Sequence, residues 1–395
     1  MTQFAARMQH LQKSFIREIL KVTENPDIIS FAGGLPNPAF FPVQEIAQAA
    51  QKVLQQDGFS VLQYSTTEGY PPLRQFIANR YRERFGFEVS PAEILITNGS
   101  QQGLDLIGKL FLNSGDPLLI ESPGYLGAIQ AFSFYQPRFH SVTLLADGPD
   151  TQALEQAFIE HRPKLFYAVP NFQNPSGLTY SLQKRQQVAS LLNRHNVLFI
   201  EDDPYGELRF SGEHLPSLKN YSENVVLLGS FSKVVSPGMR LGWICANPEI
   251  MDKLIIAKQA ADLHSNYLSQ RIVYQYLADN DLDSHLVTIK QAYKQQRDLM
   301  VEMMEECFPP EVSFTRPEGG MFVWVTLPAG MSSMQLFENA TQRNVAFVPG
   351  HPFHINGQGD NTLRLNFSNS NAVKIETGIT RLAQAMKEQL EGALQ

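Results

Sequence analysis

Residues 164–201 read KLFYAVPNFQNPSGLTYSLQKRQQVASLLNRHNVLFIE. The stretch begins and ends with short apolar runs, Lys164–Val169 and Val197–Glu201, each bounded by turn-forming residues. Such runs are typical of strands buried on both faces of a parallel sheet. Between them, Ser181–Arg194 carries Val188 and a pair of leucines at the spacing of one buried helix face. The stretch therefore predicts a strand–helix–strand crossover unit.

The same alternation continues on both sides of this unit. Further short apolar runs lie at Glu93–Thr97, Pro117–Glu121, Val225–Leu228 and Leu241–Cys245. Repeated strand–helix order predicts an α/β architecture with a mostly parallel sheet flanked by helices. A ligand is expected at the carboxyl ends of the strands.

The pattern changes after about residue 285, where helical segments become longer and strands fewer. Two strand-like runs remain in this part, Met321–Leu327 and Thr362–Phe367. We therefore expect an N-terminal helix or arm (1–35), a large domain (36–285) and a smaller C-terminal α+β domain (286–395).

The composition excludes several classes of protein. The chain has 395 residues, with 32 Lys+Arg against 39 Asp+Glu, so its formal charge is −7. An acidic balance argues against a nucleic-acid binder. Two cysteines cannot form a disulfide scaffold, and the nine histidines are dispersed, so we expect no metal site.

No run approaches the ~20 apolar residues of a membrane-spanning helix. We expect a cytoplasmic protein, with an organellar transit peptide as the alternative because the N-terminus is basic and poor in acids.

The sequence contains no complete version of the common nucleotide-binding, zinc or serine-hydrolase motifs. Gly103–Lys109 spells G-x-x-x-x-G-K, but Leu110 stands where a phosphate loop requires serine or threonine. The dinucleotide motif G-x-G-x-x-G, the zinc motif H-E-x-x-H and the serine-hydrolase motif G-x-S-x-G are absent from the sequence.

One loop does carry a chemical pattern. Gly229–Arg240 (GSFSKVVSPGMR) joins two predicted strands and contains Ser230, Lys233 and Arg240. A hydroxyl and a planar guanidinium suit a phosphate group. A lysine in such a pocket can lose its proton and form a Schiff base with an aldehyde. Taken alone, Lys233 would be interpreted as an exposed loop lysine, because lysine side chains are mostly exposed.

This loop resembles the pyridoxal-phosphate lysine loop of the fold-type I, class I/II aminotransferases. Four other segments resemble that family's motifs, namely Thr97–Gln102 (TNGSQQ), Asn171–Gly177 (NFQNPSG), Glu201–Tyr205 (EDDPY) and Thr362–Leu365 (TLRL). The match spans about residues 14–390, and the serine of NPSG keeps the hydroxyl of the commoner threonine. The resemblance implies the fold-type I transferase fold, with a mostly parallel seven-stranded sheet, and pyridoxal 5'-phosphate (PLP) as cofactor.

The resemblance also implies roles for individual residues. The catalytic residues would be Lys233, Asp202 and Tyr205. The cofactor would be bound by Ser100, Gln101, Tyr125, Asn174, Asp202, Tyr205, Ser230, Ser232, Lys233, Arg240 and Tyr64. The substrate would be bound by Arg364, Gly34, Asn174, Arg17 and Tyr64.

Each role has a stated chemistry in the family. Lys233 forms the Schiff base and transfers a proton, and Asp202 pairs with the ring nitrogen of the cofactor. Arg364 grips the substrate carboxylate. Tyr64 reaches the phosphate in the neighbouring subunit, which implies a homodimer with shared active sites.

Taken singly, several of these residues have plainer structural explanations. These are helix capping for Ser100 and Gln101, core packing for Tyr125, an ordinary turn and a buried tyrosine for Asn174 and Tyr205, and an ion pair for Arg364.

Two N-terminal segments indicate a branch of the family. Ser30–Pro38 (SFAGGLPNP) and Ser14–Arg17 resemble the 2-aminoadipate (LysN-type) and kynurenine II aminotransferases, and Asp262–His264 (DLH) fits them. The resemblance implies a 2-aminoadipate, aromatic or aliphatic amino donor and 2-oxoglutarate as acceptor. Arg17 would meet a distal carboxylate, unless it is an ordinary exposed helical arginine.

Two rival functions share the fold. One is a PLP enzyme with different chemistry, such as a lyase. The other is a cofactor-sensing regulator fused to a DNA-binding module, which the acidic charge and the roughly thirty residues before Ser30 disfavour.

Overall fold

The computed structural model describes residues 3–10, 19, 22 and 25–393. Its centre is an eight-stranded sheet in the order β2-β9-β8-β7-β6-β3-β4-β5. The strands are β2 (Ile94–Thr97), β3 (Pro117–Ser122), β4 (Arg138–Leu145), β5 (Gly148–Pro149), β6 (Leu165–Ala168), β7 (Leu198–Asp202), β8 (Val225–Ser230) and β9 (Gly242–Cys245). The six apolar runs that predicted strands in this part of the chain are confirmed.

The sheet is mostly parallel, as predicted. Strands β4, β3, β6, β7 and β8 pair in parallel, while β9 runs antiparallel to both β8 and β2. The predicted number of seven strands is wrong by one, because the two-residue β5 adds an antiparallel edge to β4. Two residues carry no side-chain periodicity, so only the pairing of Leu144 with Pro149 and Leu145 with Gly148 identifies this strand. Strand β4 also escaped prediction because it is only partly buried and has no continuous apolar run.

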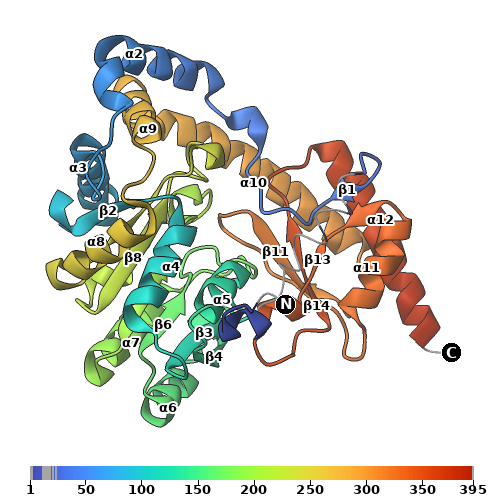
Figure 1. Ribbon diagram of the computed structural model, residues 1–395. Helices are drawn as coiled ribbons and strands as arrows, with labels where there is room; N and C mark the ends of the chain where they lie inside the picture. The colour runs from blue at the N-terminus through green and yellow to red at the C-terminus, as the bar shows by residue number, and fades with distance from the viewer. Residues whose placement is uncertain (1–2, 11–18, 20–21, 23–24, 394–395) are drawn as a thin grey trace.

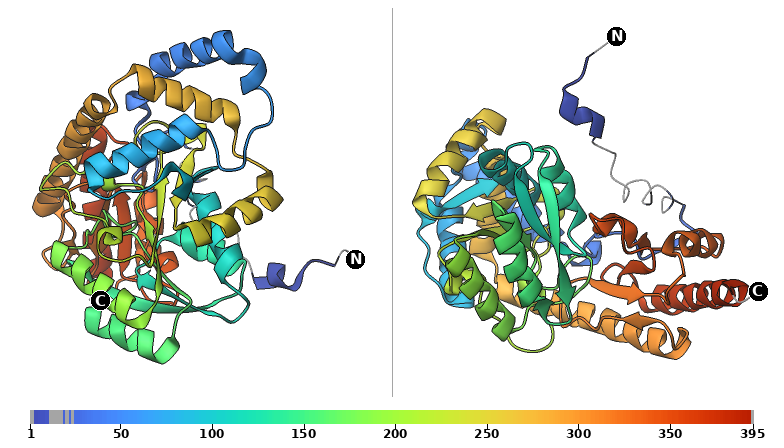
Figure 2. Two further views of the ribbon diagram at one scale, coloured as in Figure 1. Left: turned by 90° about the vertical axis from the view of Figure 1, so that its left-hand side faces the viewer. Right: turned by 90° about the horizontal axis from the view of Figure 1, so that it is seen from below.

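Helices cover both faces of this sheet (Figures 1 and 2). They include α4 (Ser100–Phe111), α5 (Leu126–Ser133), α6 (Thr151–His161), α7 (Leu182–His195) and α8 (Pro248–Asp262). Successive strand residues alternate between the faces, so Leu118 and Ile120 join one buried cluster with α4, while Leu119 joins another with α6 and α7. The α7 helix is the crossover predicted between β6 and β7.

Most of the longer remaining elements form two groups. One consists of α2 (Val43–Val61), α3 (Pro71–Arg80) and α9 (Tyr267–Asp279). The other has a four-stranded antiparallel sheet, β10 (Ser313–Phe314), β11 (Phe322–Thr326), β14 (Thr362–Asn366) and β13 (Val348–Pro349), with α10 (Leu282–Cys307), α11 (Ser333–Gln342) and α12 (Ala372–Ala393). Short single-turn helices lie at Ala6–His10, Pro38–Phe40, Tyr81–Phe85, Pro91–Glu93, Gly206–Leu208, Leu218–Asn220, Pro237–Met239 and His351–Phe353.

The N-terminal segment joins the C-terminal part of the chain. Strand β1 (Ile29–Ser30) pairs in parallel with β12 (Val345–Ala346), and Asn366 of β14 donates its backbone N–H to the carbonyl of Phe31. This pairing holds the segment that leads to Gly34, where an added Cβ would lie 3.5 Å from the Phe322 ring of β11. None of the helices in the described ranges is long and apolar enough to cross a membrane.

Candidate active site

A cavity of about 310 Å³ lies where the carboxyl ends of β7 and β8 meet the start of α4 and strand β14. Its position agrees with the expected ligand site of a parallel sheet. The predicted residues that line it are Gly34, Ser100, Gln101, Tyr125, Asn174, Asp202, Tyr205, Ser230, Ser232, Lys233, Arg240 and Arg364. Val169, Pro204 and Pro237 also line it and were not predicted.

Lys233 lies in the turn that follows β8, and its amine enters the cavity. The Nζ atom donates a hydrogen bond to the carbonyl of Gly34 at 2.9 Å. Burial lowers the pKa of this amine to about 8, and the nearby Arg364 and Arg240 add to the effect. The lowered pKa makes the neutral, nucleophilic amine accessible near neutral pH.

Asp202 is the last residue of β7 and is only 2% exposed. Its Oδ2 accepts a hydrogen bond from the Tyr167 hydroxyl at 2.7 Å, while Oδ1 has no partner among the described residues. Burial raises the pKa of Asp202 to about 7. A buried carboxylate oxygen without a partner is costly, so this atom suits a cationic N–H group from outside the chain.

Tyr167 is a site residue that the sequence did not reveal. Tyr167 lies within the apolar run of β6, where the sequence pattern predicts an ordinary core residue. It contacts Asp202 because β6 and β7 are neighbours in the sheet. Burial and the Asp202 carboxylate raise the pKa of its phenol well above its usual value. The neutral phenol is therefore a permanent hydrogen-bond donor to Oδ2 of Asp202.

The start of α4 forms an anion site beside Arg240. Gly99 is the N-cap and offers no side-chain hydrogen bond, so Ser100 and Gln101 are the first helical residues rather than caps. Their backbone N–H groups and the helix dipole favour an anion. Gly99 has a φ of +75°, and a Cβ there would lie 2.6 Å from Nη2 of Arg240. Glycine is thus required for the close approach of the guanidinium.

Ser230 and Ser232 order the loop next to this anion site. The backbone N–H of Ser232 donates to Oγ of Ser230 at 3.0 Å, and that hydroxyl contacts the Leu241 carbonyl at 3.4 Å. The Arg240 guanidinium donates to the carbonyls of Asn98 and Pro237, each at 3.3 Å.

Arg364 stands at the opposite end of the cavity on β14 and is 2% exposed. It donates to Oδ1 of Asn174 and to the Ala32 carbonyl, both at 2.7 Å, and its Nε has no partner among the described residues. It forms no ion pair with any residue in the described ranges, which argues against the alternative of a surface ion pair. Burial lowers its pKa to about 10.

Two phenylalanines hold this guanidinium in place. The rings of Phe322 and Phe353 lie 4.4 and 5.3 Å from its central carbon. Cation–π contacts partly compensate a buried cation, but they leave its negative partner missing. The arrangement therefore suits the carboxylate of a small substrate.

Tyr125 and Tyr205 line the cavity between these two ends. Tyr125 precedes α5, and Tyr205 follows Asp202 by three residues. Burial raises the pKa of Tyr125 to about 12 and that of Tyr205 further. Both phenols are neutral at physiological pH and can donate a hydrogen bond.

The predicted site residue Tyr64 does not line this cavity. Tyr64 is 79% exposed, and its ring packs edge-on against His264 with 5.9 Å between the ring centroids. Arg17 lies outside the described residues.

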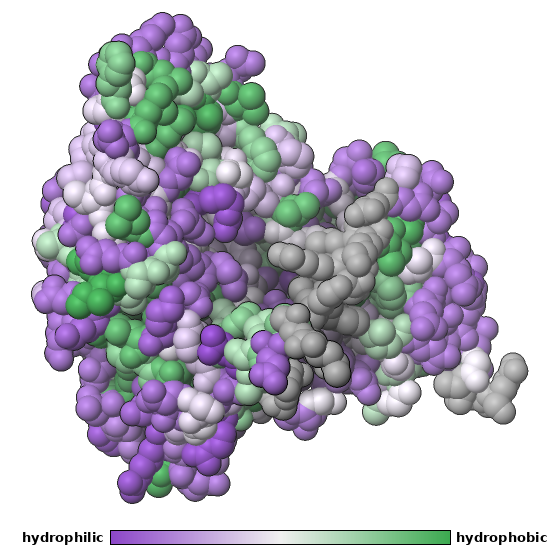
Figure 3. Space-filling view, in the orientation of Figure 1, coloured by the Kyte–Doolittle hydropathy of each residue, from purple (hydrophilic) through white to green (hydrophobic). Residues whose placement is uncertain are grey.

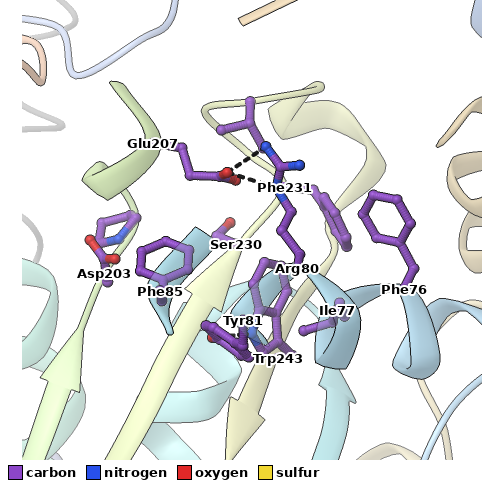
Figure 4. Close-up of a pocket in the computed structure, with 12 residues that line it drawn as sticks. Phe76, Ile77, Arg80, Tyr81, Phe85, Asp203, Glu207, Ser230, Phe231 and Trp243 are labelled. Atoms are coloured by element: carbon purple, nitrogen blue, oxygen red, sulfur yellow. Dashed lines mark hydrogen bonds and ion pairs between the residues drawn. The ribbon is translucent and has the colours of Figure 1, made fainter. Parts of the chain in front are cut away.

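A second, smaller pocket of about 30 Å³ lies behind the lysine loop (Figure 4). Phe231 and Trp243 pack there at 4.8 Å between centroids, and the indole N–H donates to the Tyr81 hydroxyl at 2.6 Å. Arg80 and Glu207 form an ion pair at 2.5 Å above these rings. This packing supports the turn that presents Lys233.

The residues present fit a phosphorylated pyridine aldehyde. The start of α4 and Arg240 suit its phosphoryl group, the unpaired Oδ1 of Asp202 suits a protonated ring nitrogen, and Lys233 suits the aldehyde carbon.

Comparison with known proteins agrees with this reading. The family model "Aminotransferase class I and II" matches residues 27–382. The solved structure of LysN, the α-aminoadipate aminotransferase of Thermus thermophilus, in complex with N-(5'-phosphopyridoxyl)-L-leucine, is 44% identical with a TM-score of 0.92, covering 98% of both chains. Pyrococcus horikoshii kynurenine aminotransferase is 42% identical with a TM-score of 0.94, covering 98% of this chain and 97% of that one. "Aromatic-amino-acid aminotransferase 1" of Thermococcus litoralis is 42% identical over 98% of this chain and 95% of its own length.

These matches confirm the predicted fold, enzyme class and PLP cofactor, and with them the transfer of an amino group from an amino acid to a 2-oxo acid. The chain belongs to the class I and II aminotransferases.

Proposed function

We propose that this aminotransferase takes 2-aminoadipate, aromatic or aliphatic L-amino acids as donors and 2-oxoglutarate as acceptor, with Lys233 as its catalytic amine. The observation that supports the site is the position of Lys233 in one cavity with two unsatisfied buried groups, Oδ1 of Asp202 and Nε of Arg364. Those groups are complementary to a cationic ring nitrogen and to a substrate carboxylate.

When bound, PLP supplies an electron-withdrawing ring that makes the Cα–H bond of an attached amino acid acidic. Asp202, held by Tyr167, keeps the proton on the ring nitrogen. Arg364 grips the substrate carboxylate and points the Cα–H bond at Lys233. Lys233, as a neutral amine, would take the Cα proton on Nζ and then, as the ammonium, would deliver it to the carbon that came from the cofactor's aldehyde. Asn174 accepts from Arg364 through Oδ1 and so helps to hold the guanidinium in the cavity.

The breadth of donors is supported by the relatives. The neighbours named above act, by their printed names, on α-aminoadipate, kynurenine and aromatic amino acids. We propose that Arg17 binds the distal carboxylate of acidic donors, on the resemblance of Ser14–Arg17 to the same branch.

A panel of donors tests the reaction. Each donor is mixed with the PLP form of the enzyme in the absence of an acceptor, so that only one half-reaction can occur. A donor that is a substrate should give one 2-oxo acid per active site. The panel contains 2-aminoadipate, kynurenine, leucine, phenylalanine and glutamate. Release of ammonia or CO₂ in place of the 2-oxo acid would favour the lyase alternative, and no conversion of any of the five would contradict the proposed substrate range.

We also propose that the enzyme is a homodimer with shared active sites. Exposed apolar side chains, Leu54, Phe59 and Leu62, gather at the end of α2 next to Tyr64, and Figure 3 shows hydrophobic side chains over this region at the top. Contiguous exposed apolar groups of this kind mark interaction surfaces. The side chain of Tyr64 is exposed, so it is accessible to a neighbouring copy.

Mixed dimers test the sharing of sites. Tyr64→Ala and Lys233→Ala chains should each be nearly inactive alone, but random mixing should restore about a quarter of wild-type activity, because half the dimers then hold one site with both residues intact. The measurement is kcat per site after subunit exchange. No recovery in a mixture shown to exchange would mean that Tyr64 serves its own protomer.

A cytoplasmic location and the division into residues 1–35, 36–285 and 286–395 complete the proposal. The low cysteine content suits a reducing compartment. The second boundary falls near the start of α10, which packs along α12.

A further inference from the structure

Behind the start of α4, a partly buried ion pair lies outside the cavity. Lys258 is 0% exposed and donates to both carboxylate oxygens of Asp262, at 2.7 and 2.9 Å. The two residues are one turn apart at the end of α8. Asp262 is the first residue of the DLH segment, and neither residue lines the active-site cavity.

Two residues of the anion site complete a closed network with this pair. Oδ2 of Asp262 accepts from Nδ2 of Asn98 and from Nε2 of Gln102, both at 2.7 Å. Oε1 of Gln102 in turn accepts from the backbone N–H of Asn98 at 2.8 Å and from Lys258 at 3.2 Å. Asn98 is therefore held by its backbone and by its side chain.

The position of Asn98 determines the geometry of the anion site. Its carbonyl accepts from the Arg240 guanidinium at 3.3 Å, and Gly99, the N-cap of α4, follows it directly. Any rotation of the peptide between these two residues would redirect the first N–H groups of α4 and release Arg240.

The local backbone indicates that surrounding contacts hold Asp262 in a conformation that would be unfavourable on its own. A carboxylate at a helix C-terminus opposes the helix dipole. Leu263 has φ 64° and ψ −58°, and the His264 N–H donates to the Asp262 carbonyl at 2.7 Å, which is a strained three-residue turn. Such strain persists only where the surroundings over-determine it, and it is concentrated at functional sites. A buried ion pair is itself weak evidence for a role in stability.

We propose that the Lys258–Asp262 pair is a positioning element for the phosphoryl group of the cofactor. Through its hydrogen bonds to Asn98 and Gln102, it orients the start of α4 and Arg240 toward that group. This inference rests on the proposed function, in which that end of the cavity binds phosphate. It predicts an effect on phosphate recognition that a purely structural role would not produce.

The test compares the apoenzyme affinities for PLP and for pyridoxal, which lacks the phosphoryl group. Asp262→Asn should weaken PLP binding by about 10- to 100-fold, the usual cost of losing an outer-shell partner. Pyridoxal binding should change by less than about threefold, because pyridoxal has no phosphoryl group to contact the start of α4 or Arg240. Equilibrium dialysis measures both dissociation constants, and the melting temperature of each apoenzyme reports on folding.

Two further variants keep the result interpretable. Lys258→Met/Asp262→Leu removes the network without leaving an unpaired buried charge, and it should show the same selective loss if Asp262→Asn fails to fold. Asp298→Asn breaks a matched Lys–Asp bridge between Lys294 and Asp298, one turn apart on the surface of α10, and should change neither affinity.

The outcomes separate the two levels of the proposal. If the Asp262 variants lose PLP and pyridoxal binding equally, or lose neither, the positioning role is wrong. In that case a wild-type enzyme that still prefers PLP to pyridoxal would support the phosphate site. A wild-type apoenzyme that binds pyridoxal as tightly as PLP would contradict the phosphate site itself.

Discussion

Replacement of Lys233 by alanine should lower kcat by at least about 10⁴-fold, because it removes both the nucleophile that holds the cofactor and the base that moves the Cα proton. The amine stands 2.9 Å from the Gly34 carbonyl, in a cavity without another lysine among its lining residues. Borohydride should no longer fix the cofactor covalently to the variant. Steady-state rates with glutamate and 2-oxo acids, and mass spectrometry after reduction, measure the two effects.

Two control variants locate the cause of this loss. Lys233→Arg keeps a cation but cannot become a neutral amine, so it should be as inactive as the alanine variant. Lys109→Ala removes an exposed lysine bridged to Asp105 and should leave kcat unchanged. Substantial turnover by Lys233→Ala would refute the assignment of the catalytic amine.

Replacement of Asp202 by asparagine should lower kcat/KM by about 10²- to 10³-fold, the range seen when one preorganised electrostatic partner is lost. The carboxamide is nearly isosteric but neutral, so it cannot keep a proton on a ring nitrogen. Kinetics with several donors measure the loss, and the ¹⁵N chemical shift of labelled cofactor reports the protonation of its ring nitrogen separately. The nitrogen should be protonated in the wild type and unprotonated in the variant.

Tyr167→Phe supplies the matched comparison. It removes only the 2.7 Å hydrogen bond to Oδ2 and leaves the carboxylate charge, so the expected loss is about tenfold and the nitrogen stays protonated. Wild-type kcat/KM in Asp202→Asn, with an unchanged nitrogen shift, would show that another group protonates the ring.

The sequence determined the features that depend on neighbours along the chain. The buried strands show as apolar runs, and the loops after them carry Lys233, Asp202 and the start of α4, since parallel strands place their carboxyl ends at one edge of a sheet. The family motifs added Arg364 and the cofactor. These positions were predictable because each lies within a short segment whose pattern is local.

Only the tertiary structure decided the contacts between distant segments. Tyr167 meets Asp202 across neighbouring strands, Phe322 and Phe353 enclose Arg364, and Lys258 reaches Gln102 from another helix. The physical reason is that a hydrogen bond or a ring contact needs only proximity in space, so it leaves no period or spacing in the sequence. The partner of each of these polar groups was set by the packing of the elements that carry them.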